Sequence, residues 1–139
     1  MSDPASIARD YLESWNRRDW NHWRELFHPQ YSYTGGDGVR QDGPEAGMAV
    51  GQMFASAFPD GKIEIQRIHA VADVAVTEFI ARGTHQGDLM GIAATGRKVE
   101  IPVCTILEIR DGKIGAEREY MDMAHMMQQL GVMPAPATA

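Results

Sequence analysis

Residues 108–122, with the sequence EIRDGKIGAEREYMD, predict a β-hairpin around which the rest of the chain can be arranged. Asp111-Gly112 is a two-residue turn of the kind that joins antiparallel strands, and apolar residues recur on both sides of it with a period of two. Such a turn also sets the register, because Arg110 must then lie opposite Lys113. We therefore expect two antiparallel strands, at 97–110 and 113–121.

This register divides the hairpin side chains between two faces. It places Ile109 opposite Ile114, Leu107 opposite Ala116, Thr105 opposite Arg118, Val103 opposite Tyr120 and Ile101 opposite Asp122. The face that these residues form is apolar except for one threonine, one arginine, one tyrosine hydroxyl and one aspartate. The other face carries Glu108, Glu117 and Glu119, as a solvent or subunit surface would. A few polar groups in an apolar wall are typical of a small-molecule site.

The other elements follow from the period of the apolar residues. Helices are predicted at 4–15, 19–27, 44–58 and 123–130, and further strands at 31–34, 62–71 and 74–85. Helices that precede a run of strands predict an α+β fold. We expect a curved, mixed or antiparallel sheet, shaped as a cone-like half-barrel, with three to four helices enclosing an apolar pocket. A single domain over 1–133 and a flexible tail at 134–139 complete the prediction.

Composition excludes several classes of function. The chain has 139 residues, of which 44% are hydrophobic and 23% charged, as in an ordinary globular domain. Its formal charge of −6, without a basic run, argues against nucleic-acid binding. No stretch approaches the roughly 18 apolar residues of a membrane span, and no signal peptide is evident. We expect a cytoplasmic protein that binds neither nucleic acid nor membrane.

Asp122 is the first candidate catalytic residue, and it has two interpretations. In an apolar cavity, its carboxyl group would have a raised pKa, which suits a general acid or base. Alternatively, it caps the N-terminus of the helix predicted at 123–130, since aspartate is a preferred capping residue. The sequence alone leaves both open.

Further candidates lie on the same pocket face or near it. On the strand at 74–85 the more apolar face includes Phe79 and ends at His85, which we place near the pocket mouth as a second catalytic candidate. Arg118 could orient a substrate oxygen or pair with an acidic neighbour, and Tyr33 could point its hydroxyl inward or belong to the core. The remaining binding candidates are Tyr120, Thr105 and Met90, the last because methionines adapt to apolar ligands.

The sequence argues against a metal site, a phosphate-binding loop and a nucleophilic cysteine. Asp122 and His125 could supply two metal ligands, but no second pair completes a site, so no metal is expected. The segment GIAATGRK (91–98) lacks the lysine and hydroxyl pair of a phosphate-binding loop, and no helix follows it. The single cysteine, Cys104, lies on the glutamate-bearing face by the predicted register, away from the pocket.

With these elements placed, the chain resembles the SnoaL-like polyketide cyclases of the nuclear-transport-factor-2-like superfamily over roughly residues 5–133. The resemblance rests on SWNRRDW (14–20), LFHPQY (26–31), AFPDGKIEI (57–65), ARGTHQGDLMGIAATGRKVEIP (81–102), EIRDGKIGAEREYMD (108–122) and MMQQLGVMP (126–134). It implies a homodimer that binds a small hydrophobic carbonyl compound without a cofactor.

In the cyclases that the chain resembles, an aspartate near the end of the last strand deprotonates a carbon beside a carbonyl, and the enolate closes a ring. Asp122 matches this position. In those cyclases a histidine on the neighbouring strand assists the aspartate. The corresponding segment here, VCTILEI (103–109), contains no histidine, so His85 would have to take that role. The leading hypothesis is therefore such a ring closure, or a related isomerisation of the carbonyl compound. Two alternatives remain: hydration chemistry of the epoxide hydrolase or dehydratase type, using Glu78, Arg82 and Asp122, or a non-catalytic module that binds a hydrophobic ligand as a dimer.

Overall fold

The computed structural model describes residues 3–134. Four helices and six strands occur among them: α1 (Pro4–Asn16), α2 (Trp20–Glu25), β1 (Phe27–Thr34), β2 (Arg40–Asp42), α3 (Pro44–Ala57), β3 (Lys62–Val71), β4 (Val74–Thr84), β5 (Lys98–Arg110), β6 (Lys113–Met121) and α4 (Met123–Gln129). None of the helices in this part of the chain is long and apolar enough to cross a membrane. Of the predicted tail at 134–139, all but Pro134 lies outside the described residues.

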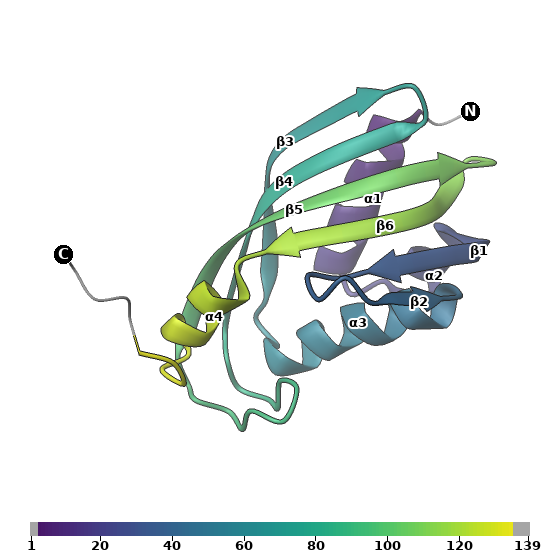
Figure 1. The fold of residues 1–139 in the computed structure, drawn as a ribbon. Helices are drawn as coiled ribbons and strands as arrows, with labels where there is room; N and C mark the ends of the chain where they lie inside the picture. The colour runs from purple at the N-terminus through teal and green to yellow at the C-terminus, as the bar shows by residue number, and fades with distance from the viewer. Residues whose placement is uncertain (1–2, 135–139) are drawn as a thin grey trace.

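The strands form one curved sheet in the order β2-β1-β6-β5-β4-β3, which does not close into a barrel. All neighbouring pairs are antiparallel except β1 and β6, which run parallel. Helices α1, α2 and α3 lie together on one side of the sheet, and α4 packs beside β5 at one end of it (Figure 1). The predicted α+β class, with a mixed half-open sheet and four helices, is confirmed.

The meander from β3 to β6 agrees closely with the predicted strands, whereas the first third of the sheet does not. Strand β1 begins at Phe27 rather than at Tyr31, and β2 lies in a segment predicted as loop. Both differences have a tertiary cause, because β1 is held by parallel pairing with β6 and β2 by pairing with β1. Neither partner is visible in the local sequence.

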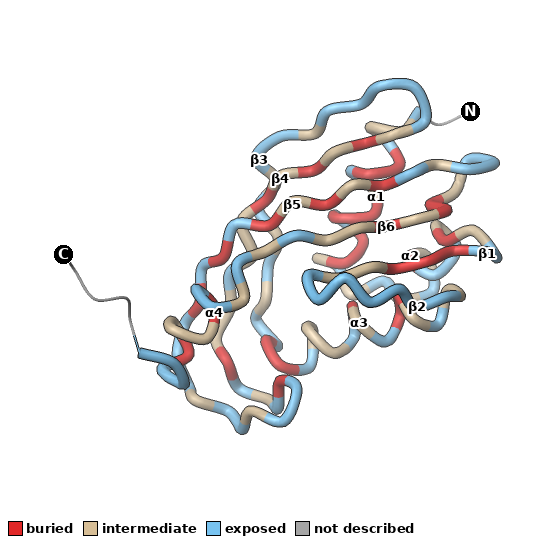
Figure 2. Tube along the Cα trace, viewed as in Figure 1, coloured by how far each residue is buried: buried red, intermediate tan, exposed pale blue. Residues whose placement is uncertain are grey.

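The core lies between the concave side of the sheet and the helices, where the buried segments of both converge (Figure 2). Aromatic rings from α1, α2 and β1 contact one another there: Tyr11 stacks on Trp23 at 5.3 Å between ring centroids, and Trp23 meets Phe27 at 4.9 Å. Helix α3 can approach because Gly51 lacks a side chain. A Cβ at that position would lie 2.3 Å from the Trp23 ring.

The predicted register of the β5–β6 hairpin is wrong beyond its first two pairs. Arg110 lies opposite Lys113 and Ile109 opposite Ile114 as expected, but Glu108 then lies opposite Ala116. Gly115 is therefore the extra residue of a β-bulge. Because side chains alternate along a strand, one extra residue turns every later side chain of β6 to the other face.

Candidate active site

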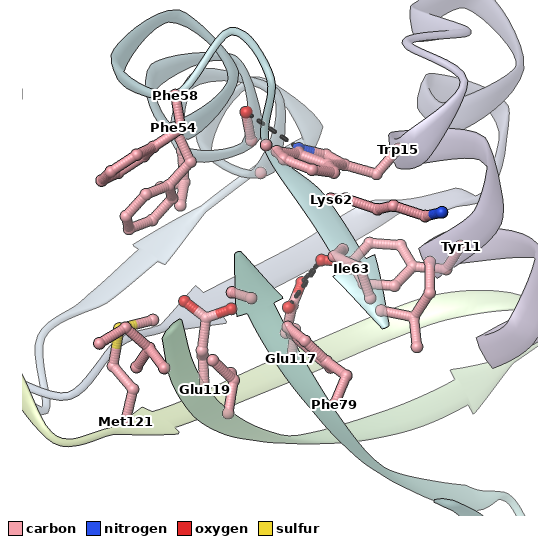
Figure 3. A pocket seen from close by; sticks show the side chains of 18 of the residues that line it. Tyr11, Trp15, Phe54, Phe58, Lys62, Ile63, Phe79, Glu117, Glu119 and Met121 are labelled. Carbon is pink, nitrogen blue, oxygen red and sulfur yellow. Dashed lines mark hydrogen bonds between the residues drawn. The ribbon is translucent and has the colours of Figure 1, made fainter. Parts of the chain in front are cut away.

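A cavity of about 100 Å³ lies between the sheet and the three covering helices. Its wall is mostly aromatic and aliphatic, with the carboxyl groups of Glu117 and Glu119 entering from β6 (Figure 3). The principal lining residues are Tyr11, Trp15, Trp23, Tyr31, Tyr33, Phe54, Phe58, Phe79, Ile101, Val103, Met121 and Met126. The site is thus an apolar chamber with one acidic wall, which differs from the pocket face predicted from the sequence.

Glu117 lies at the inner end of this acidic wall, opposite Leu107, and only 2% of it is exposed. The Tyr11 hydroxyl lies 2.8 and 2.7 Å from its two carboxylate oxygens, and the Tyr31 hydroxyl lies 2.7 Å from Oε1. Burial raises the pKa of Glu117, while the hydrogen bonds from Tyr31 and Tyr11 act in the opposite direction. Glu117 is therefore a buried carboxyl group whose ionised form has two dedicated donors.

Glu119 is the second carboxyl group, two residues along the same face and opposite Thr105. It is partly accessible, and the Tyr33 hydroxyl lies 3.0 Å from its Oε1. Burial, reinforced by the charge of Glu117, raises the pKa of Glu119 to about 7, and the Tyr33 hydrogen bond only partly opposes this. Near neutral pH, Glu119 is thus present both with and without its proton, as a general acid or base requires.

The three tyrosines act as donors throughout the neutral range. Burial raises the pKa of each phenol, and the charges of the neighbouring carboxylates raise it further for Tyr11, Tyr31 and Tyr33. All three hydroxyls therefore keep their protons. The acidic wall therefore holds two carboxyl groups and three neutral phenols that act as hydrogen-bond donors.

Asp122 does not reach the cavity, so its predicted place in the pocket is wrong. The residue is exposed, and its Oδ1 accepts a hydrogen bond of 3.0 Å from the His125 backbone N–H as the N-cap of α4. Of its two interpretations, the structure shows the capping geometry. The bulge at Gly115 is the physical reason, because the pocket face of β6 ends at Met121 instead.

The same shift turns Arg118 and Tyr120 outward, against the prediction. Arg118 forms an ion pair with Glu108 on the outer face, which was the simpler of its two interpretations, and Tyr120 is 51% exposed. Thr105 does face inward and is buried, but its hydroxyl bonds that of Thr77 at 2.5 Å and does not line the cavity.

Two predicted binding residues line the cavity, and one lies away from it. Phe79 and Tyr33 are both part of the wall, from β4 and β1 respectively. Met90 is 53% exposed in the loop between β4 and β5 and is not among the lining residues. Their roles in binding a substrate stay predictions.

His85, predicted at the pocket mouth, is instead fully buried behind the wall. Its ring packs on Phe58 at 5.6 Å between centroids, and Phe58 lines the cavity whereas His85 does not. Its Nδ1 accepts a hydrogen bond of 3.2 Å from the Thr95 backbone N–H. Within residues 3–134, Nε2 is the one buried side-chain nitrogen or oxygen without a hydrogen-bond partner.

The residues that the hydration hypothesis needed do not converge in the cavity. Glu78 faces outward and lies 3.4 Å from His69, while Arg82 sits at the rim and binds Glu64 and Glu100 at 2.8 and 2.7 Å. No group of three histidine, cysteine, aspartate or glutamate side chains in the described part of the chain could hold a metal ion.

Sequence reasoning missed Glu117 and Glu119, which it assigned to the solvent-facing side. One available signal was Gly115, because an isolated glycine inside a strand pattern often marks a bulge. A bulge there would have moved both glutamates into the pocket. Their pairing with tyrosines from α1 and β1 could not be read from the strand itself.

Comparison with known proteins places this geometry in a family. The model of the SnoaL-like polyketide cyclases matches residues 5–130. The chain belongs to the SnoaL-like polyketide cyclase family. Among curated relatives of this family member, the aklanonic acid methyl ester cyclase AcmA of Streptomyces galilaeus is 27% identical over 140 residues, which cover 99% of this chain and 96% of the relative.

Two solved structures of similar fold carry different functional descriptions. IdmH of Streptomyces antibioticus, described as a candidate polyketide cyclase, has a TM-score of 0.82 and 29% identity, and the match covers 94% of this chain and 100% of that one. AclR of Streptomyces galilaeus, described as a candidate hydroxylase, has a TM-score of 0.80 and 25% identity, with 94% of this chain and 82% of that one covered. Proteins with this fold are thus described as catalysing more than one kind of reaction. The reaction of this chain must therefore be inferred from its site.

Proposed function

We propose that this SnoaL-like protein is a cofactor-free cyclase in which Glu119 is the general acid and base. The observation that supports this most strongly is the position of Glu119: a carboxyl group with a pKa of about 7, inside an apolar cavity, hydrogen-bonded to the Tyr33 hydroxyl. The aromatic wall suits a hydrophobic substrate, and the Tyr33 hydroxyl and the protonated form of Glu119 can donate hydrogen bonds to its carbonyl oxygens.

The proposed reaction is an intramolecular aldol addition, and it returns every proton it takes. The ionised Glu119 removes a proton from a carbon next to a carbonyl group, and the electron pair is held as an enolate. The enolate carbon then bonds to a second carbonyl carbon of the same molecule, which closes a ring. The alkoxide formed in that step recovers the proton from Glu119, so neither an oxidant nor a reductant is needed.

Tyr33 would have two roles in this cycle. Its hydroxyl fixes the rotamer of Glu119, and it can turn toward a substrate oxygen on which negative charge develops, because its own proton is retained at neutral pH. Loss of one such donor typically costs 10²- to 10³-fold in turnover, roughly. Tyr33→Phe should therefore be impaired but folded.

The test is turnover of a carbonyl substrate by Glu119→Gln. Aklanonic acid methyl ester, the compound in the name of the AcmA relative, is the first probe, followed by smaller diketones that suit the cavity. We expect Glu119→Gln to fold, to bind the probe and to lose turnover by roughly 10² to 10⁴, which is the usual contribution of a general acid or base. Asp122→Asn is the matched control, since Asp122 lies outside the cavity.

The outcomes separate the competing hypotheses. Activity that survives Glu119→Gln and is lost in Asp122→Asn would return the catalytic role to Asp122 and contradict the proposal. Probe binding without any turnover by the wild-type protein would favour a binding module instead.

We also propose that two copies associate through the outer face of the sheet. Apolar side chains surround the charged Glu78 and Arg118 on the side away from the helices: Val76, Ile80, Pro102, Cys104, Ile106 and Tyr120. Such a face is self-complementary in a two-fold dimer. Sedimentation should show a dimer that Ile80→Glu/Ile106→Glu converts to a folded monomer; a monomeric wild-type protein at micromolar concentration would contradict this.

A further inference from the structure

The acidic wall contains a second carboxyl group that the proposed reaction does not use. Glu117 is 2% exposed and is held by Tyr11 from α1 and Tyr31 from β1, with three oxygen–oxygen distances of 2.7 to 2.8 Å. Glu119 has one such donor, Tyr33 at 3.0 Å. The two carboxyl groups share one face of β6 two residues apart, so their backbones are separated by roughly 7 Å. Glu117 therefore has two hydroxyl donors and Glu119 has one, although the two carboxyl groups interact.

We propose that Glu117 is a positioning residue: Tyr11 and Tyr31 hold it as the anion of the pair, and its charge keeps the shared proton on Glu119. This inference rests on the proposed function of Glu119, whose chemistry it regulates. Two short hydrogen bonds to an ionised carboxylate favour the charged form strongly, whereas a single longer one favours it less. The first proton to leave the pair is accordingly that of Glu117, and Glu119 keeps its own until near neutral pH.

The other titratable groups around the pair do not reverse this order. The titratable groups that helix α1 and strand β1 contribute to the wall are all neutral phenols, which are Tyr11, Tyr31 and Tyr33. Asp37, in the loop after β1, adds a further negative charge near Tyr33. Helix α3 contributes only glycine, valine and phenylalanine to the wall. Lys62 and Arg82 are the cations among the lining residues; both are exposed, and Arg82 is already bound by Glu64 and Glu100.

A purely structural role for Glu117 would be to fasten α1 and β1 to β6. That role predicts lower stability on substitution but no change in the proton affinity of Glu119. Glu117→Gln separates the two, because the glutamine oxygen still accepts from a tyrosine hydroxyl while the charge is gone. Tyr31→Phe removes one donor, and Tyr33→Phe is its matched control because it removes the donor of Glu119 itself.

The experiment is a pH titration of the glutamate side-chain carboxyl carbons by ¹³C NMR, in the full chain and without substrate. We expect the Glu119 midpoint to fall by about one to two pH units in Glu117→Gln, if the roughly 7 Å between the two backbones is used as the separation of the two charges at an effective dielectric constant of about 20. Tyr31→Phe should move the midpoint down as well, because Glu117 then competes for the proton, and Tyr33→Phe should move it up. The acid limb of the pH profile of kcat/KM should move with it.

A Glu119 midpoint that stays within about 0.3 pH units of the wild-type value in both folded Glu117→Gln and folded Tyr31→Phe would overturn the inference. Shifts of the Glu119 midpoint in opposite directions in these two variants would overturn it as well. The NMR titration does not depend on turnover, so inactivity of the wild-type protein on every probe would contradict the proposed function while leaving the titration interpretable.

Discussion

Replacing Glu119 with glutamine should remove a loss of stability that the wild-type protein undergoes as the pH rises. In the folded chain the pKa of Glu119 is raised to about 7 by burial and by the charge of Glu117. In the unfolded chain a glutamate titrates at about 4.3. Between these two values the folded protein binds a proton that the unfolded chain has released, so the free energy of unfolding decreases with rising pH.

The size of the effect follows from the two pKa values. A difference of about 2.7 units at 1.36 kcal/mol per unit corresponds to about 4 kcal/mol, an upper bound because Glu119 is partly accessible. The stabilising contribution is complete below about pH 4.3 and is lost by about pH 7.5. Glutamine has no proton to lose, and its carbonyl oxygen can still accept from Tyr33. The free energy of unfolding of the variant should therefore rise relative to that of the wild type across this pH interval.

Urea unfolding of both proteins at half-unit steps from pH 4.5 to 8.5 measures this, because titrating groups other than the interacting Glu117 largely cancel in the difference. We expect the variant minus wild-type difference in unfolding free energy to become more favourable by about 2 to 3 kcal/mol over this range. A difference that stays constant to within about 0.5 kcal/mol would show that Glu119 titrates like a solvated glutamate. Glu119 would then be fully ionised at neutral pH and could not act as the general acid.

Two further predictions concern the frame around the site. Asp122→Ala should lower the free energy of unfolding by about 1 kcal/mol, because it removes the N-cap of α4, and should leave turnover unchanged; urea unfolding and steady-state rates check both parts. Gly51→Ala should lower the melting temperature although alanine favours helices, because its Cβ would lie 2.3 Å from the Trp23 ring, and overpacking of this kind costs roughly 1 to 3 kcal/mol. A Gly51→Ala variant as stable as the wild type would show that the contact between α3 and Trp23 is looser than described.

The fold could be predicted from the sequence because its signals are local and consistent. Asp3-Pro4 begins α1, Asp122 begins α4, and Asp111-Gly112 joins β5 to β6, each by a short-range rule that no distant partner overrides. The apolar alternation of β4 and β5 is equally local. The pairing of β1 with β6 is not, because parallel partners lie far apart in the sequence.

The sequence predicted where the site lies but not which residues form it. The last strand before α4 does carry the polar groups of the cavity, as expected, but they are Glu117 and Glu119 rather than Arg118 and Asp122. A turn specifies the register at its own end of a hairpin and says nothing of a bulge three residues later. The buried state of Glu117 depends moreover on two hydroxyls that come from α1 and β1, which alternation along β6 does not reveal.

The measurement that tests the central claim most directly is the register of β6, read from cross-strand nuclear Overhauser effects between backbone protons of β5 and β6. The bulge at Gly115 predicts contacts that place Leu107 opposite Glu117 and Thr105 opposite Glu119. Contacts that instead place Leu107 opposite Ala116 and Thr105 opposite Arg118 would return both glutamates to the outer face. The acidic wall, and the acid and base assigned to it, would then be contradicted.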